Sequence, residues 1–168
     1  TDASTVLIVS AGEALDEVKC TPVRIAAMAG SVDRHSWDQA EWMASYATGR
    51  DLWKRTDYKP ADVDTAQLYD GFSFLAITWL EALGFCDVGE GGRFIEGGKR
   101  IALDGELPLN TFGGQIAGGR LHGFGFAHEA VVQLRGLGCD RQIKGNPKVA
   151  VATSGGGPLA TALLLARD

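Results

Sequence analysis

The sequence predicts an α/β layered domain with a mixed five-stranded sheet and helices on both faces. Apolar, β-branched runs alternate with stretches whose apolar residues recur every three or four positions, which is typical of strands alternating with helices. Two apolar runs then follow each other near the C-terminus across a glycine-rich turn, which favours two adjacent strands. The length of 168 residues and 45% hydrophobic content indicate one packed domain over residues 1–168.

The first strands and helix are expected in the N-terminal 30 residues. The run Val-Leu-Ile-Val at residues 6–9 is apolar and β-branched, which predicts a buried strand. Residues 13–18 follow with an amphipathic pattern, so we expect a helix that ends at Pro22. Residues 23–29 predict the second strand.

The remaining elements follow the same two patterns. They are a helix over 38–53 with Ser36 or Asp38 as its N-cap, a strand over 64–70, helices over 74–83 and 123–134, and strands over 149–152 and 159–166. The last two strands are expected to form an antiparallel hairpin. Residues 86–111 contain repeated glycine turn signals, which predict a long, functional loop with short strand fragments.

Charge and composition exclude several classes of function. The chain carries 16 Lys plus Arg against 21 Asp plus Glu, and this net charge of −5 argues against electrostatically driven nucleic-acid binding. The longest apolar stretches are shorter than the roughly 20 residues that a membrane span needs. The N-terminus has no secretory pattern, and the three cysteines are odd in number and widely separated. We therefore expect a cytoplasmic protein without a disulfide framework or a zinc site.

Glycines and polar residues gather in four segments that could form a site. Of the 23 glycines, 19 follow residue 83. The four segments are residues 68–73, 109–115, 118–123 and 153–157. Each places polar groups at the end of a predicted strand or in a glycine loop, where open α/β sheets bind ligands. The glycine patterns that bind phosphates are absent in the required context.

Two of these segments contain residues that can carry protons, Tyr69 and His122. Histidine has an unperturbed pKa of about 6.5 and tyrosine of about 10, so His122 is the easier base at neutral pH. Tyr69 would need a hydrogen-bond network or a cation such as Arg120 to act as one. Asp70 is expected to point to the opposite side of the strand from Tyr69. A lone tyrosine at a strand end and a lone histidine in a glycine loop are more often structural, so by themselves these residues indicate only a possible site.

Five motifs in one order resemble the C-terminal half of the thiolase superfamily. They are Tyr-Asp-Gly-Phe-Ser at 69–73, Leu-Glu-Ala-Leu-Gly-Phe-Cys at 80–86, Leu-Pro-Leu-Asn-Thr-Phe-Gly-Gly-Gln at 107–115, the glycine-rich histidine loop at 118–123, and Gly-Gly-Gly-Pro-Leu-Ala at 155–160. The similarity is greatest to the branch of lipid-transfer proteins and sterol carrier protein X. It implies a βαβαβαββ half whose N-terminal counterpart is absent from this chain.

Departures from the thiolase pattern indicate a different reaction. Tyr69 stands where this branch has an oxyanion-hole histidine, and Arg120 stands at the histidine of the Gly-His-Pro loop. Residues 152–155 lack the catalytic cysteine. The chain thus resembles the thiolase-like aldolases of steroid side-chain degradation. This resemblance implies retro-aldol cleavage of a β-hydroxyacyl-CoA to a ketone and a shorter acyl-CoA, with acyl-CoA as substrate and no cofactor.

The resemblance also implies roles for individual residues and partners. Tyr69 is expected to remove the hydroxyl proton, and His122 is expected to protonate the enolate. Oxyanion and substrate binding are expected from Arg120, Asn110, Gly119, Gly155 and Gly156. Expected partners are an N-terminal thiolase half, a second copy in a homodimer, and a small OB-fold protein that binds acyl-CoA. Two alternatives remain: half of an acetyl-CoA acyltransferase, and a non-catalytic lipid-transfer or scaffold domain.

Overall fold

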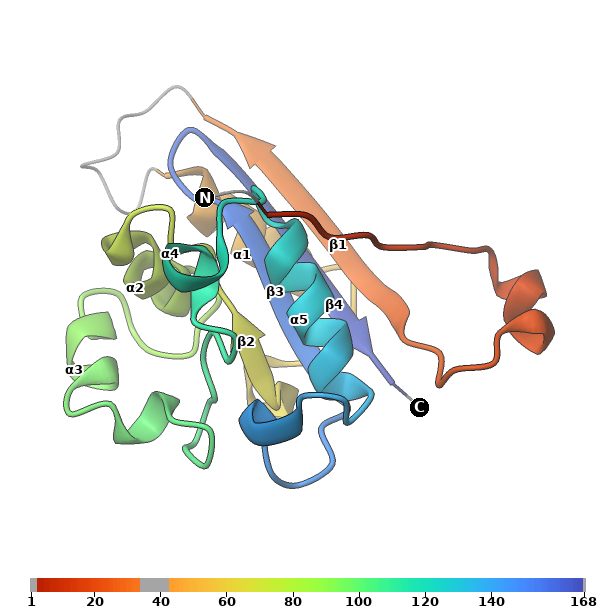
Figure 1. Ribbon diagram of the computed structural model, residues 1–168. Helices are drawn as coiled ribbons and strands as arrows, with labels where there is room; N and C mark the ends of the chain where they lie inside the picture. Colours follow the sequence, from red (N-terminus) through yellow and green to blue (C-terminus); the bar gives the residue numbers. More distant parts are fainter. Residues whose placement is uncertain (1–2, 34–42, 168) are drawn as a thin grey trace.

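A mixed sheet with the strand order β1-β4-β3-β2 forms the centre of the computed structural model, which describes residues 3–33 and 43–167 (Figure 1). Its strands are β1 (Arg24–Val32), β2 (Thr65–Gln67), β3 (Val149–Gly155) and β4 (Leu159–Ala166). β4 is antiparallel to both β1 and β3, while β2 is parallel to β3. The predicted C-terminal hairpin is therefore confirmed, and the carboxyl ends of β2 and β3 lie at the same edge of the sheet.

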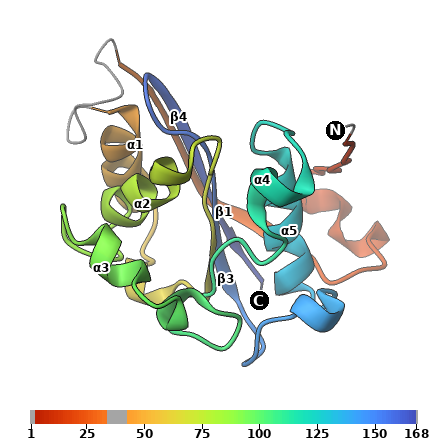
Figure 2. The ribbon, with the colours of Figure 1, turned by 60° about the vertical axis from the view of Figure 1, so that its left-hand side comes forward.

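Helices cover both faces of the sheet, as predicted (Figure 2). α1 (Ala44–Trp53) and α2 (Ser73–Ala82) pack on one face, and α5 (Phe124–Leu134) packs on the other over β2 and β3. Two short helices, α3 (Gly91–Ile95) and α4 (Gly114–Gly118), lie in the long connection between α2 and α5. Residues 86–111 thus contain helical turns where strand fragments were expected.

The predicted strand over residues 6–9 is wrong, so the described residues form four strands rather than five. Ile8 is 93% exposed, and this extended segment passes along the outer side of α5 (Figure 2). Among the described residues, no strand pairs with this segment, so it does not extend the sheet. The pattern that predicted a helix over 13–18 corresponds to an exposed 3-10 helix over Gly12–Glu17.

The other predicted helices are confirmed within about two residues, apart from the start of the second helix. α1 begins at Ala44 in the part of the chain that the structure describes. The two predicted caps, Ser36 and Asp38, lie outside the described residues. Along that part of the chain, no helix is both long and apolar enough to cross a membrane.

The two faces of the β1–β4 pair differ in how well they are covered. Ala27, Ala29 and Ala162 turn one face toward α1 and are buried, because small side chains let the helix approach closely. The alternate residues of the opposite face include Met28, Val32 and Leu159, which are exposed. We call these three residues the uncovered sheet face. α5 does not cover it because this helix packs over β3 and β2.

Candidate functional site

The structure brings the predicted segments together at the carboxyl ends of β2 and β3. The backbone N–H of Tyr69 donates a hydrogen bond of 2.8 Å to the hydroxyl of Thr153. The hydroxyl of the next residue, Ser154, donates a hydrogen bond of 2.9 Å to the carbonyl oxygen of His122. Two consecutive residues of β3 therefore hold the backbones of the two predicted proton carriers.

The side chain of Tyr69 is held between Phe126 and Gly71. The rings of Tyr69 and Phe126 lie 6.0 Å apart at 52°, and Tyr69 is only 7% exposed. A Cβ at Gly71 would fall 2.6 Å from the Tyr69 hydroxyl oxygen, so only glycine leaves room for this ring. No hydrogen bond joins the hydroxyl to any residue that the structure describes, which leaves the group available to a ligand.

Asn110 fixes the backbone just before Tyr69. Its Oδ1 accepts a 2.6 Å hydrogen bond from the N–H of Leu68, and its Nδ2 donates one of 2.9 Å to the carbonyl of the same residue. The side-chain amide of Asn110 thus forms a pair of hydrogen bonds with the backbone of Leu68, as the backbone of a neighbouring strand would. Asn110 adopts a left-handed conformation with φ of 48°, which asparagine tolerates better than most residues. Its role in substrate binding stays a prediction.

The side chain of Asp70 points toward α4, whereas the ring of Tyr69 packs against Phe126. Its Oδ1 accepts a 2.9 Å hydrogen bond from the N–H of Gln115. Burial raises the pKa of the Asp70 carboxyl, while the backbone N–H groups of Gln115, Ile116 and Asp70 itself act in the opposite direction. Sequence reasoning weighed Asp70 only as a neighbour of Tyr69. The paired glycines at 113–114 were the sequence feature that could have predicted the close approach of the α4 backbone to the Asp70 carboxylate.

The loop between α4 and α5 carries Gly119, Arg120 and His122. Gly119 has φ of 95° and is buried, while Arg120 and His122 are exposed. Among the described residues, neither of these two side chains has a hydrogen bond or an ion pair. His122 itself has φ of 47°, so the loop turns sharply before α5 begins.

The predicted glycine donors are largely engaged within the chain. The N–H of Gly119 donates to the carbonyl of Gln115, and that of Gly156 donates to the carbonyl of Leu159. The carbonyl of Gly155 accepts a 2.9 Å hydrogen bond from the indole of Trp79. The N–H groups of Gly119 and Gly156 are therefore not free to bind an oxyanion in this conformation. The glycines shape the turns that position the site.

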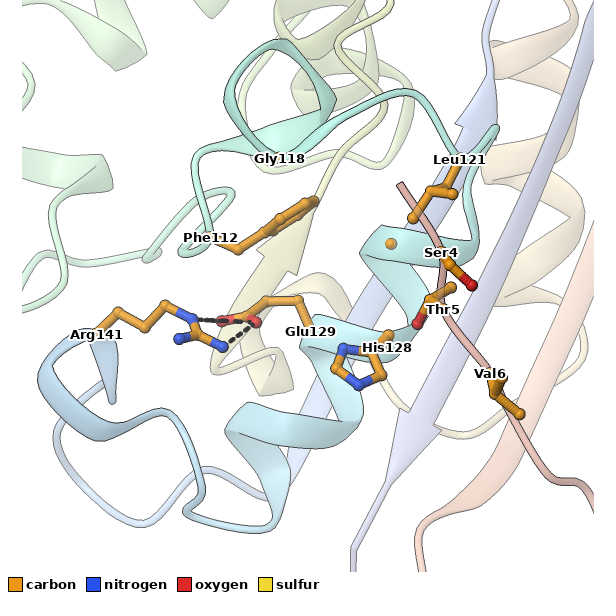
Figure 3. A pocket seen from close by; sticks show the side chains of 10 residues that line it. Ser4, Thr5, Val6, Phe112, Gly118, Leu121, His128, Glu129 and Arg141 are labelled. Carbon is orange, nitrogen blue, oxygen red and sulfur yellow. Dashed lines mark hydrogen bonds and ion pairs between the residues drawn. The ribbon is translucent and has the colours of Figure 1, made fainter. Parts of the chain in front are cut away.

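A pocket of about 420 Å³ lies beside this edge, between the start of α5 and the N-terminal segment (Figure 3). Phe112, Leu121, His128 and residues 4–6 contribute to its walls. The ring of Phe112 packs edge-on against the ring of Phe126, with the ring centres 5.4 Å apart. The ring of Phe126 also contacts Tyr69. Two aromatic rings thus link the pocket to Tyr69.

The pocket is also lined by an ion pair that sequence reasoning missed. Glu129 is 2% exposed and pairs with Arg141, with Nε to Oε1 at 3.0 Å and Nη2 to Oε2 at 3.1 Å (Figure 3). Thr111 and Gln133 also donate to Oε1, at 2.7 and 2.9 Å. The signal in the sequence was a glutamate and a glutamine four residues apart beside the apolar stripe of the predicted helix.

In residues 3–33 and 43–167, no group of three or more His, Cys, Asp or Glu side chains lies close enough to hold a metal ion. The cysteines Cys20, Cys86 and Cys139 are all unpaired. Burial, with a smaller effect from the charge of Glu81, raises the pKa of the Cys86 thiol to about 11. This environment disfavours the thiolate, which argues against Cys86, a half-buried residue, as a nucleophile.

A family model described as "Thiolase C-terminal domain-like" matches residues 29–166. The chain belongs to the thiolase C-terminal domain family. This match confirms the family that the five motifs indicated. It also confirms the fold class, since the strands and helices described above lie almost entirely within the matched range.

Curated relatives of this thiolase C-terminal domain include two lyases. It is 35% identical, over 98% of its length, to the "17-hydroxy-3-oxo-4-pregnene-20-carboxyl-CoA lyase" of Mycobacterium tuberculosis, and covers 44% of that protein. It is 36% identical, over 71% of its length, to the "Steroid side-chain-cleaving aldolase" of Thermomonospora curvata, and covers 30% of it. The chain thus spans less than half the length of these relatives.

Among solved structures, the domain is similar to the "Ltp2-ChsH2(DUF35) aldolase". The TM-score is 0.83 with 29% sequence identity, and the match covers 94% of this chain and 42% of the other. The fold of this chain therefore has a counterpart in part of a protein that is described as an aldolase.

Proposed function

We propose that this chain is the C-terminal half of an acyl-CoA retro-aldolase, a lyase that cleaves a β-hydroxyacyl-CoA into a ketone and a shorter acyl-CoA. The observation that supports this proposal most is the setting of Tyr69. Its ring is buried at the joint edge of β2 and β3, while its hydroxyl has no partner in the described part of the chain. The names of the two lyase relatives support the same reaction class.

In the proposed mechanism, Tyr69 acts in its phenolate form and takes the proton from the β-hydroxyl group of the substrate, so that it becomes a phenol. The bond between the α and β carbons then breaks, so the β carbon leaves as a ketone and the α carbon carries the electrons as a thioester enolate. His122 donates a proton to this enolate and yields the shorter acyl-CoA. Arg120, on the same loop as His122, would stabilise the negative charge on the enolate oxygen and on the phenolate. No nucleophilic cysteine is required.

Exposed apolar side chains near Tyr69 support an apolar acyl group, such as a steroid or lipid side chain. The rings of Phe72 and Phe74 stack at 6.2 Å just beyond Tyr69, and both are exposed. Ile116 in α4 and Phe124 at the start of α5 are also exposed, and these two helices flank the site. These side chains would lose water contact on binding an apolar substrate or the other half of the protein.

We also propose an N-terminal half as the principal partner. The uncovered sheet face leaves apolar side chains of β1 and β4 in water, and the lyase relatives are more than twice as long as this chain. A small OB-fold protein that binds acyl-CoA is a second proposed partner, which the paired name of the similar structure supports. A homodimer and a cytoplasmic location complete the proposal, and the unpaired cysteines support a reducing compartment.

The experiment is a cleavage assay on the protein with its N-terminal half and small partner present. A β-hydroxyacyl-CoA with a tertiary hydroxyl is supplied, and the ketone and shorter acyl-CoA are measured by mass spectrometry. Tyr69→Phe should lower the rate by about 100-fold or more, because the proton acceptor is lost. Tyr58→Phe is the matched control, since the Tyr58 hydroxyl bonds Arg24 at the surface.

Three outcomes would contradict the proposal. Near-normal cleavage by Tyr69→Phe would remove Tyr69 from the mechanism. Thiolysis of a β-ketoacyl-CoA by free CoA, without cleavage of the hydroxyacyl substrate, would indicate an acyltransferase half. Binding of acyl-CoA without any turnover would indicate a lipid-transfer or scaffold domain.

A further inference from the structure

The carboxylate of Asp70 connects the two parts of the candidate site. Asp70 follows Tyr69 in the chain, and its side chain is buried, with 7% of the residue exposed. Its Oδ1 accepts the N–H of Gln115 in the first turn of α4, at 2.9 Å. A Cβ at Gly114 would fall 2.7 Å from the Asp70 Cγ, so the carboxylate occupies the space that a side chain would need.

The helix α4 is short and largely exposed. It has five residues, and its last three, Ile116, Ala117 and Gly118, are exposed. A helix this short is not stable by itself, so its position depends on contacts with its surroundings. α4 leads directly into the loop at 119–123 that carries Arg120 and His122. A displacement of α4 would therefore move both side chains relative to Tyr69.

We propose that Asp70 is a positioning residue that couples Tyr69 to the loop of His122 by fixing the first turn of α4. The inference rests on the proposed function, because it assigns this coupling to the cleavage reaction. Asp70 does not touch the reacting atoms in this scheme. A buried carboxylate suits the task because its hydrogen bond to a backbone N–H is charge-assisted and stronger than a neutral one.

The test compares Asp70→Asn with Asp64→Asn in the assembled protein. Asp64 is the matched control because its Oδ2 also accepts backbone N–H groups, those of Lys148 at 2.7 Å and Val149 at 2.9 Å. These bonds join the starts of β2 and β3, at the end of the sheet opposite to Tyr69. Because the asparagine Oδ1 can still accept, the two variants replace the same kind of charge-assisted hydrogen bond with a weaker neutral one, at opposite ends of one strand pair.

Two quantities are measured, the amide hydrogen exchange of residues 115–122 and the steady-state constants of cleavage. Asp70→Asn should increase exchange in 115–122 by about tenfold or more, since the local opening becomes easier. It should lower kcat by about tenfold or more with a smaller change in KM, because the reacting groups are misplaced rather than lost. Asp64→Asn should leave both quantities near the wild-type values.

A second variant approaches the same bond from the donor side. Gln115→Pro removes the N–H that Asp70 accepts, and the first turn of a helix tolerates proline. It should reproduce the effects of Asp70→Asn. Unchanged exchange in 115–122 for both variants would overturn the inference, as would faster exchange with unaltered kcat. If the wild-type protein cleaves no β-hydroxyacyl-CoA, the proposed function fails, while the exchange measurement still decides whether Asp70 fixes α4.

Discussion

Gly71 lies against the ring of Tyr69, the residue two positions before Gly71 in the chain. A Cβ at Gly71 would come within 2.6 Å of the tyrosine hydroxyl and 2.7 Å of the ring carbon that bears it. The absence of a side chain at position 71 thus sets where the Tyr69 hydroxyl lies, between Gly71 and the ring of Phe126.

Gly71→Ala should therefore displace the Tyr69 ring and lower cleavage by about tenfold or more, since a small displacement of a reacting group is costly. Stability should fall by about 1–3 kcal/mol, as is usual when a methyl group is forced into a packed region. Gly12→Ala is the control, because nothing lies within 4 Å of a Cβ at that position. A Gly71→Ala protein with full activity would show that the ring position does not matter.

Ser154→Ala should loosen the His122 loop. The variant loses the 2.9 Å hydrogen bond to the His122 carbonyl, so we expect a loss of about 1 kcal/mol in the free energy of unfolding. Urea-induced unfolding measures this loss, and Ser10→Ala, at an exposed position, provides the control. Equal stability of the two variants would argue that the Ser154 bond does not hold the loop.

Glu129→Gln should destabilise the protein by about 1–3 kcal/mol. This is less than the usual cost of breaking a fully buried pair, because the Arg141 side chain is 42% exposed and water can replace part of the interaction. Asp51→Asn removes one partner of the exposed Asp51–Lys54 pair and should change the free energy of unfolding much less than Glu129→Gln does. A comparable small loss in both variants would contradict a structural role for the buried pair.

The raised pKa of the Asp70 carboxyl predicts a pH dependence of stability. The folded protein binds a proton at Asp70 at a pH where the unfolded chain, with a pKa near 3.8, has not yet done so. The stabilisation that this proton provides is absent at a pH well above the pKa of Asp70 in the folded protein. It grows as the pH falls through that pKa, and it is complete below the pKa of the same group in the unfolded chain. Wild type should therefore gain stability relative to Asp70→Asn as the pH is lowered from neutral toward about 4. A constant or opposite difference would argue against the raised pKa.

Cys86 should resist alkylation. At pH 9 a thiol with a pKa of about 11 is about 1% thiolate, and the thiolate is the form that reacts with iodoacetamide. Cys20 and Cys139 are exposed and should be labelled well before it. Mass spectrometry of peptides from the folded protein measures the order of labelling. Simultaneous labelling of all three thiols in folded protein would contradict this environment for Cys86.

The sequence by itself determined the family, the layered fold and most of the elements. The hairpin of β3 and β4 and the helices α2 and α5 have strong local patterns, because burial of one face imposes the period of the apolar residues. The run at residues 6–9 has the same composition as a buried strand. Composition shows that a segment can be buried, whereas pairing requires a free strand edge within reach.

Only the tertiary structure decided how the site is held. The sequence placed Tyr69, Asn110 and His122 in separate segments, but it could not show that Thr153 and Ser154 hold the backbones of Tyr69 and His122. It also could not show that Asp70 reaches α4, or that Gly156 donates its N–H within the hairpin. The hydrogen bonds of Thr153, Ser154 and Asp70 join residues 32 to 84 positions apart, so they depend on how the elements pack in three dimensions, and a local sequence pattern carries no record of that packing.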